Sequence, residues 1–316
     1  MAVPRPARTA GRGRPSMAAA RLRGVTAMLL APALLAAAAQ TTGAAPVPGA
    51  SYPVQAAYTP PEPYATTTGV VTGGSGRAVY DLYYPGNYGA LGFKSPIVTW
   101  GNGSAATPRM YSTLLGHLAS YGFTVIASTS PTTGSGSQID AAARYLVAQD
   151  GTPGSVFYRR LDVHHVAAVG HSQGAGGAVR AAISDPGVIT ALMTFSLPVT
   201  LLLTGPSTAR LAQPTFFIST YGPFDAVIAP PWAERAFYRH VRVHAALGII
   251  RDSDGKRADH TSVQDAAYGG NPGGLLGYAT AWLEYRLRGN ATAGGAFSGP
   301  RPELVSNTNW PGSAAK

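Results

Sequence analysis

A serine in a glycine-rich turn is the clearest sign of chemistry in the sequence. Residues 170–174 read G-H-S-Q-G and fit the pattern G-x-S-x-G, between an apolar stretch that predicts a strand and a small-residue stretch that predicts a helix. A sharp turn there lifts the serine hydroxyl above the sheet, and Cβ atoms at the two glycines would clash with neighbouring backbone. The predicted nucleophile elbow consists of Gly170, His171 and Gly174 around Ser172.

A serine is a weak nucleophile at neutral pH, so it needs a base that is itself held by a third group. The histidines downstream of it are His240, His244 and His260. The first two flank a Val-Arg-Val alternation entering a strand, where they would share one face, solvated or packed. His260 lies in the polar loop 252–262 after the last predicted strand, from which an imidazole can reach the serine. We therefore expect His260 to be the base, the alternative being a surface-loop histidine.

The acid that orients the base is expected between the serine and the histidine. Asp225 follows the predicted strand 214–220 in the run Tyr-Gly-Pro-Phe-Asp, which is a suitable place. The other aspartates between Ser172 and His260 are Asp185, Asp252, Asp254 and Asp259. The first comes too early and the last adjoins the histidine, so that it would struggle to orient the ring. The middle two stay open as alternatives to Asp225.

Acyl transfer also needs two backbone N–H groups for the oxyanion. One is expected from the loop after the predicted strand 96–100, where the sequence reads Gly-Asn-Gly-Ser and can turn its N–H groups inward. We assign this donor to Asn102, within one residue. The other follows the nucleophile at Gln173, at the start of a helix whose partial positive charge favours an anion.

Alternating strands and helices must position these residues. The strands are expected at 78–84, 96–100, 123–128, 166–170, 189–195, 214–220 and 241–250, and the helices at 111–121, 139–148, 172–183, 232–238 and 275–285. The last helix is predicted to start at Asn271 and Pro272 and to stop at Gly289. Repeated alternation of this kind predicts an α/β fold with a mostly parallel sheet and helices on both faces.

The first 44 residues have the pattern of an export signal. Six arginines and no acidic residues precede or lead into an apolar run at 25–39, followed by small residues. A start at Met17 would give a more ordinary signal. The run is shorter than the roughly 20 residues that span a bilayer, so no permanent membrane anchor is expected. The chain has 24 basic and 14 acidic residues, a net charge of +10, and loss of the six arginines leaves 18 against 14, or +4.

This charge distribution excludes a nucleic-acid-binding protein, since no basic cluster remains after the leader. The chain of 316 residues has no cysteine, which excludes disulfides and thiol nucleophiles. We predict an extended Pro/Thr/Gly-rich lead-in at 45–76, whose later part pairs at a sheet edge, one catalytic domain at 77–289, and a Gly/Pro/Ser-rich tail at 290–316 along the surface.

The sequence resembles secreted actinobacterial cutinase-like polyester hydrolases of the α/β-hydrolase fold and, more distantly, dienelactone hydrolases. The resemblance rests on residues 96–103, 118–123, 170–174, 225–230 and 278–283. It implies Ser172, Asp225 and His260 as the triad and backbone oxyanion donors near Asn102 and at Gln173.

Departures from that family bear on the substrate. The chain has Gln173 where the family usually has Met, Asn102 where it has an aromatic residue, and Phe-Ser-Leu-Pro at 195–198 where it carries Trp. The carboxy-terminal disulfide of those enzymes cannot form here. Aliphatic rather than aromatic polyesters are therefore the expected polymers.

These observations predict a secreted serine esterase acting on small or polymeric esters as a monomer. No cofactor and no metal is expected, since the run Asp252-Ser253-Asp254-Gly255 lacks the glutamate of a calcium loop and neighbouring His164 and His165 point to opposite faces of a strand. A secreted acyltransferase or peptidase with the same triad, or a non-catalytic exported binding protein on the same scaffold, is the alternative.

Overall fold

One large sheet forms the centre of the molecule. The structure is a computed structural model and describes residues 52–253, 255–264 and 271–316. Within them nine strands form a sheet in the order β1-β2-β4-β3-β5-β6-β7-β8-β9. The strands from β4 to β8 in this order pair in parallel, whereas β1, β2 and β9 are antiparallel to their neighbours. The prediction of an α/β fold with a mostly parallel sheet is confirmed.

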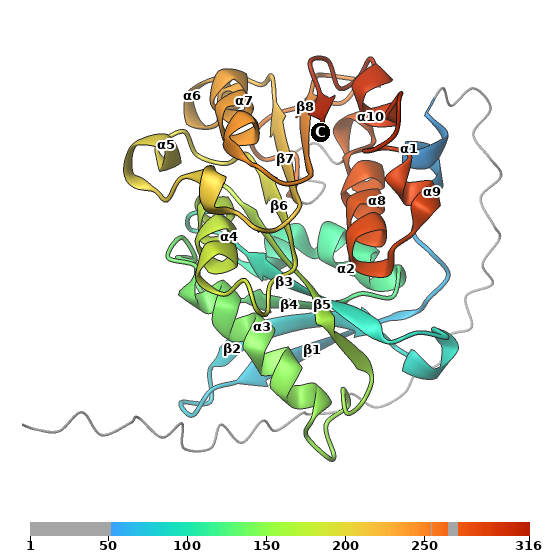
Figure 1. Ribbon diagram of the computed structural model, residues 1–316. Helices are drawn as coiled ribbons and strands as arrows, with labels where there is room; N and C mark the ends of the chain where they lie inside the picture. The colour runs from blue at the N-terminus through green and yellow to red at the C-terminus, as the bar shows by residue number, and fades with distance from the viewer. Residues whose placement is uncertain (1–51, 254, 265–270) are drawn as a thin grey trace, which may run out of the picture.

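The elements alternate along the chain (Figure 1). The strands are β1 Thr66–Thr72, β2 Ala78–Pro85, β3 Ser95–Gly101, β4 Thr124–Ser128, β5 Leu161–His171, β6 Ala191–Phe195, β7 Thr215–Thr220, β8 Ala245–Ile250 and β9 Ala314–Ala315. The α-helices are α1 Pro53–Tyr58, α2 Ser112–Ser120, α3 Ser137–Asp150, α4 Gln173–Ser184, α5 Leu201–Thr204, α6 Asp225–Ile228, α7 Pro231–His240, α8 Leu275–Arg288, α9 Ala291–Gly294 and α10 Glu303–Ser306. Short 3₁₀ turns are η1 Tyr88–Ala90, η2 Pro108–Tyr111, η3 Thr208–Arg210 and η5 Pro272–Gly274.

The central strands bury both faces because helices cover both. Figure 1 shows α2 and α8 on one side of the sheet and α3, α4 and α7 on the other. Successive residues of a strand point to opposite faces, so Ala167 and Val169 of β5 belong to the core on the α2 and α8 side, whereas Ala168 packs on the α4 side. In the same way Phe216 and Phe217 of β7 belong to the two different cores. This explains why these strands are apolar throughout rather than alternating.

Two predicted boundaries differ clearly from the structure. The strand predicted at 166–170 begins at Leu161, five residues earlier. A strand was expected over 241–250, but α7 continues to His240 and β8 begins only at Ala245. The Val-Arg-Val alternation lies in the connection between them. Alternation of residue type therefore did not mark a strand here, because the segment has no strand partner before Ala245.

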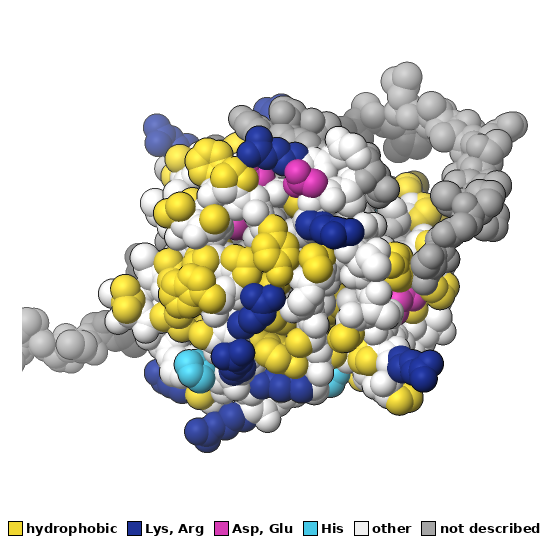
Figure 2. Space-filling model, turned by 90° about the horizontal axis from the view of Figure 1, so that it is seen from above, with side chains coloured by type: hydrophobic (Ala, Val, Ile, Leu, Met, Phe, Trp, Pro, Cys, Tyr) yellow, Lys and Arg dark blue, Asp and Glu magenta, His cyan; other side chains and the backbone are white. Residues whose placement is uncertain are grey.

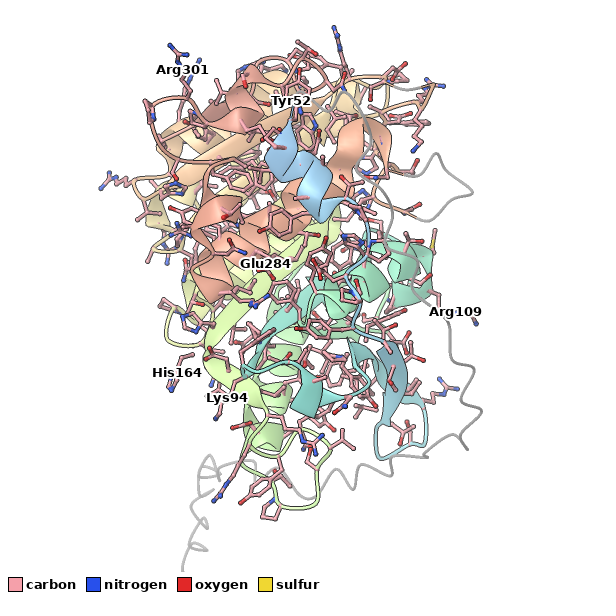
Figure 3. All side chains as sticks on the ribbon, turned by 90° about the vertical axis from the view of Figure 1, so that its right-hand side faces the viewer. Tyr52, Lys94, Arg109, His164, Glu284 and Arg301 are labelled. Carbon is pink, nitrogen blue, oxygen red and sulfur yellow. The ribbon has the colours of Figure 1, made fainter. Side chains whose placement is uncertain are left out.

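The lead-in behaves as predicted in its later part. β1 pairs antiparallel with β2 at the edge of the sheet. Its earlier part contains a helix that was not predicted, α1, which lies against α8 (Figure 3). The Glu303 carboxylate of α10 accepts hydrogen bonds from the backbone N–H groups of Val54 and Gln55, at 2.7 and 2.8 Å, and so ties α1 to the carboxy-terminal segment.

The prediction that the tail lies along the surface is wrong. Trp310 and Leu304 are completely buried, and Phe297 is almost completely buried. The Trp310 indole N–H donates to the carbonyl of Gly273 at 2.8 Å, and β9 pairs with β8 and covers that edge of the sheet. The segment was misjudged because its Gly- and Pro-rich composition hides a few large side chains that have no regular spacing.

The predicted signal, residues 1–44, lies outside the described residues. Among the helices of the described ranges, none has the length and apolar character that a membrane crossing requires. The amino-terminal part of the lead-in, 45–51, also lies outside the described residues.

Candidate active site

Ser172 stands between β5 and α4 in a strained conformation. Its φ is 53° and its ψ is −124°, a combination that residues with a Cβ adopt only when the surrounding structure enforces it. A Cβ at Gly170 would lie 2.3 Å from the carbonyl oxygen of Gly174, and one at Gly174 would lie 2.3 Å from that of Gly101. The two glycines of the motif therefore allow β5, α4 and the loop after β3 to meet at the serine.

Asp225 and His260 form a hydrogen-bonded pair. His260 Nδ1 lies 2.7 Å from Asp225 Oδ1, and the carboxylate is completely buried. Asp225 begins α6, directly after the turn that follows β7, whereas His260 lies in the loop after β8. The order of the parallel strands β5, β6, β7 and β8 brings the loops at their carboxyl ends together, which explains how residues so distant in sequence meet.

Donors surround the second carboxylate oxygen of Asp225. Oδ2 accepts hydrogen bonds from Ser196 Oγ at 2.9 Å, from Thr220 Oγ1 at 2.8 Å and from Thr220 N–H at 3.0 Å, with Ser219 Oγ at 3.3 Å. A buried charge is tolerated only when it is paired or hydrogen-bonded. These donors stabilise the ionised carboxylate and fix its plane, so that Oδ1 is presented to the imidazole.

His260 lies beside the serine elbow. Its backbone carbonyl is 2.8 Å from Nε2 of His171, the residue immediately before Ser172. The two imidazole rings also contact each other, with ring centroids 4.7 Å apart. The structure thus brings the Asp225–His260 pair to the turn that carries Ser172.

The alternative acids have other partners. Asp252 accepts a hydrogen bond from Ala258 N–H at 2.8 Å, and Asp259 accepts from the N–H groups of Phe224 and His260. Both shape the loop rather than contact the imidazole. Asp185 forms an ion pair with Arg144, and Asp254 lies outside the described residues.

The other two downstream histidines lie apart from this cluster. His240 ends α7 and is exposed. The His244 ring stacks on Trp282 of α8, with centroids 5.6 Å apart. Of the downstream histidines in the described ranges, His260 alone has an Asp or Glu carboxylate within hydrogen-bonding distance of its ring.

The loop after β3 is fixed by the side chain of Asn102. This amide is completely buried, donates to the carbonyls of Ser128 and Ser130 at 2.6 and 3.0 Å, and accepts from Trp100 Nε1 at 3.0 Å. The following N–H, that of Gly103, already donates to the Tyr111 hydroxyl at 3.0 Å. Within the one-residue margin of the prediction, this leaves the Asn102 N–H as the better oxyanion donor.

Gln173 supplies the first N–H of α4. The first N–H groups of a helix have no acceptor within the helix, and this one follows the serine directly. The Gln173 side chain turns away, because its Nε2 donates to the carbonyl of Pro131 at 2.7 Å. The backbone N–H is therefore the group through which Gln173 can act on an anion at the serine.

Two buried ionisable side chains lie near the pair: His171, which was predicted only as part of the elbow, and Glu234, which the sequence analysis did not identify. Burial, strengthened by the nearby His260, lowers the pKa of His171 to about 3, so its ring is neutral at ordinary pH. Glu234 of α7 is completely buried, and burial together with the charge of Asp225 raises its pKa well above the usual range. Its Oε1 accepts from Leu197 N–H at 2.8 Å, whereas no donor reaches Oε2.

In the described residues, no group of three or more His, Asp or Glu side chains is placed so that it could hold a metal ion. His165 Nδ1 instead contacts Asp162 at 2.7 Å, and the labelled His164 lies at the surface in Figure 3.

A comparison with known protein families finds a match over most of the chain. The family model described as PETase, PET hydrolase-like, matches residues 36–264. The matched segment includes the serine elbow, the loop after β3, Asp225 and His260.

Proposed function

The chain belongs to the PET hydrolase-like family, which makes it an ester hydrolase of the α/β-hydrolase fold, and from this premise we propose that it cleaves carboxylic esters through an acyl-enzyme on Ser172. The observation that carries the proposal is the meeting of the strained Ser172 turn with the Asp225–His260 pair, whose atoms are 2.7 Å apart. Each group has the chemistry that its role requires, and no other described histidine has such a partner beside this serine.

In the first half-reaction His260 Nε2 takes the proton of Ser172 Oγ while Oγ bonds to the ester carbonyl carbon. The carbonyl electron pair moves onto oxygen, and the N–H groups of Asn102 and Gln173 stabilise that oxyanion. Collapse of the intermediate breaks the bond to the alcohol oxygen, which leaves with the proton from His260. Asp225 Oδ1 accepts a hydrogen bond from His260 Nδ1–H throughout and is not itself protonated, so the lone pair that takes the serine proton is on Nε2.

In the second half-reaction water replaces the alcohol. His260 removes a proton from water as its oxygen attacks the acyl carbon, and the second oxyanion uses the same two N–H groups. When this intermediate collapses, Ser172 Oγ recovers its proton and the carboxylic acid departs. Side chains and backbone groups of this chain supply every step, so the reaction requires no cofactor.

For the substrate we propose short to medium acyl esters and aliphatic polyesters. Exposed apolar side chains lie next to the catalytic acid, with Phe224 64% and Val227 75% exposed on either side of Asp225. Leu203 and Trp232 add to them at 84% and 62%, and Figure 2 shows hydrophobic side chains gathered over the part of the molecule that holds α5, α6 and α7. Exposed apolar surface beside a site favours contact with an apolar solid.

Export is part of the proposal. The arginine-rich start, the apolar run and the small residues of 1–44 support cleavage near residue 44. Amino-terminal sequencing of protein recovered from the medium of an expressing culture tests it; a protein that keeps residues 1–44 and stays in the cells would contradict export.

A fluorophosphonate probe and p-nitrophenyl esters of increasing chain length test the chemistry. We expect covalent labelling and turnover by the wild type, and loss of both in Ser172→Ala. Absence of both in the folded wild type would leave a non-catalytic binding protein.

A second experiment tests the polymer substrate. Val227→Ser should slow the release of products from an aliphatic polyester film severalfold without affecting the turnover of soluble esters. The control is Val305→Ser, which changes an exposed valine on α10.

A further inference from the structure

A continuous chain of hydrogen bonds joins the three segments that meet at the site. Gly103 N–H, in the loop after β3, donates to Tyr111 Oη at 3.0 Å. Tyr111 Oη lies 3.0 Å from Nδ1 of His171, next to the nucleophile. His171 Nε2 lies 2.8 Å from the carbonyl oxygen of His260. Tyr111 is completely buried and His171 is 2% exposed, so little water competes for these bonds.

In this chain of hydrogen bonds, the donor and the acceptor of each bond can be assigned consistently. The His260 carbonyl can only accept, so Nε2 of His171 must carry a proton. Because burial keeps this ring neutral, with its pKa at about 3, Nδ1 is an acceptor and the Tyr111 hydroxyl donates to it. The lone pairs of Tyr111 Oη then accept from Gly103 N–H and, more weakly, from Gln264 Nε2 at 3.4 Å. Every group in the chain has a partner, as buried polar groups require.

Packing leaves the residues of this hydrogen-bond chain little room to move. The Tyr111 ring lies against Trp100 of β3, with ring centroids 4.7 Å apart, which fixes where the hydroxyl stands. Gly103 is pressed so closely to the imidazole that a Cβ there would lie 2.9 Å from His171 Nδ1. Displacement of any one of the three segments would therefore stretch a bond to another.

We propose that Tyr111 and His171 are positioning residues, which hold the oxyanion loop and the His260 loop at fixed places relative to Ser172 without contacting the substrate. The proposal rests on the proposed function, since it gives the chain a role only if Ser172 and His260 react. Gly103 adjoins the Asn102 donor, His171 adjoins the nucleophile, and the last acceptor is the backbone of the base itself. Misplacement of catalytic groups by about 1 Å can lower the rate about 100-fold. Hydrogen bonds that keep these groups in place would therefore preserve activity.

Tyr111→Phe is the direct test, because it removes only the hydroxyl and leaves Gly103 N–H and His171 Nδ1 without a partner. We expect kcat for a soluble p-nitrophenyl ester to fall about tenfold while KM changes by less than about twofold, since binding contacts remain. The control is Tyr121→Phe. This hydroxyl is also in the core region and donates to the carbonyl of Pro60 at 2.7 Å, away from the site. It should lose similar stability but keep its kcat. An unchanged kcat in Tyr111→Phe, or an equal fall in both variants, would overturn the proposal.

Nitrogen NMR of ¹⁵N-histidine-labelled protein reads the chain independently of activity. We expect His171 to show a protonated Nε2 and an unprotonated Nδ1 down to about pH 4, one unit above its pKa of about 3, and the Nδ1 signal to shift in Tyr111→Phe. A protonated Nδ1 at neutral pH in an active enzyme would overturn the proposed hydrogen-bond chain but not the proposed function. If the wild type neither labels nor turns over, the proposed function fails instead, and the kinetic role fails with it.

Discussion

The two sides of His260 are held in opposite ways. On one side, the buried Asp225 carboxylate contacts the ring and receives hydrogen bonds from Ser196, Ser219 and Thr220. On the other side, the neutral ring of His171 contacts the backbone carbonyl, with Tyr111 behind it. The charged side orients the imidazole, and the neutral side fixes the loop that carries it.

The two sides differ in the free energy that burial requires. A buried charge loses its hydration, so several donors must replace water around Asp225. A neutral link has no such penalty and needs only one partner for each polar atom, but the loss of one bond then breaks the whole chain. Glu234, one helix further on, illustrates the rule: it is buried with a single hydrogen bond, and its pKa is raised well above the usual range.

The largest effect is expected from Asp225→Asn, which should lower kcat for soluble esters about 10⁴-fold. The donors around Oδ2 would attract the amide oxygen, which turns the NH₂ group toward His260 Nδ1. That nitrogen must then accept, so the proton moves to Nε2 and the ring can no longer take the serine proton. Steady-state kinetics on the folded variant measures this, and a loss below tenfold would redirect the search to Asp252 or Asp254.

His171 should make the protein sensitive to acid. Its pKa is about 3 in the folded state, against an ordinary value of 6.5 for histidine. Between these values the unfolded chain binds a proton that the native state does not, so stability is fully present above about pH 6.5 and is lost as the pH falls toward 3. The total loss is on the order of 3 to 5 kcal/mol.

Urea unfolding from pH 3 to pH 7 measures this loss by comparing the wild type with His171→Gln. The variant lacks the group that titrates, and the other acidic groups are common to both proteins. A flatter pH dependence is expected for the variant. Parallel curves would show that the neutral ring of His171 does not contribute to acid sensitivity and would break the contrast between the two sides.

Sequence reasoning succeeded where the chemistry is local. The G-x-S-x-G turn constrains five consecutive residues, and the backbone of Ser172 has the strained conformation that the pattern predicts. The alternation of strands and helices was likewise sufficient for the parallel sheet. The roles of the site residues remain predictions that the experiments above can test.

Sequence-based prediction failed where the contacts are long-range or irregular. Tyr111 and His171 are 60 residues apart, and His171 and His260 are 89 apart, so no spacing reveals their contact. In the sequence, Tyr111 was only the first residue of the helix predicted over 111–121. Trp310 lies in a Gly- and Pro-rich tail whose composition suggested exposure. Burial and pairing in such places follow from the whole fold rather than from any segment.

Glu234→Gln should stabilise the protein in alkali. The pKa of Glu234 is raised in the folded state, so the stability it contributes is fully present below its ordinary value near 4.5 and is lost as the pH rises through the folded value. Glutamine keeps the acceptor for Leu197 N–H and cannot ionise. We expect the variant to be more stable than the wild type at pH 8, with little gain near pH 4. Thermal or urea unfolding at the two pH values measures it; an equal effect at both would mean that ionisation of Glu234 plays no part.

The smallest effect is expected from Ser196→Ala. It removes one of several donors to Asp225 Oδ2 and leaves both Thr220 groups in place. A hydrogen bond to a charged group contributes about 1.5 to 3 kcal/mol at most, and the remaining donors offset part of the loss. The fall in kcat should therefore be about threefold, smaller than that of Tyr111→Phe, although Ser196 donates directly to the carboxylate proposed as the catalytic acid. Parallel kinetics on the two variants decides the point. If Ser196→Ala lowers kcat more than Tyr111→Phe does, the other donors to Asp225 Oδ2 do not compensate for the lost bond. The proposed difference between the two sides of His260 would then be wrong.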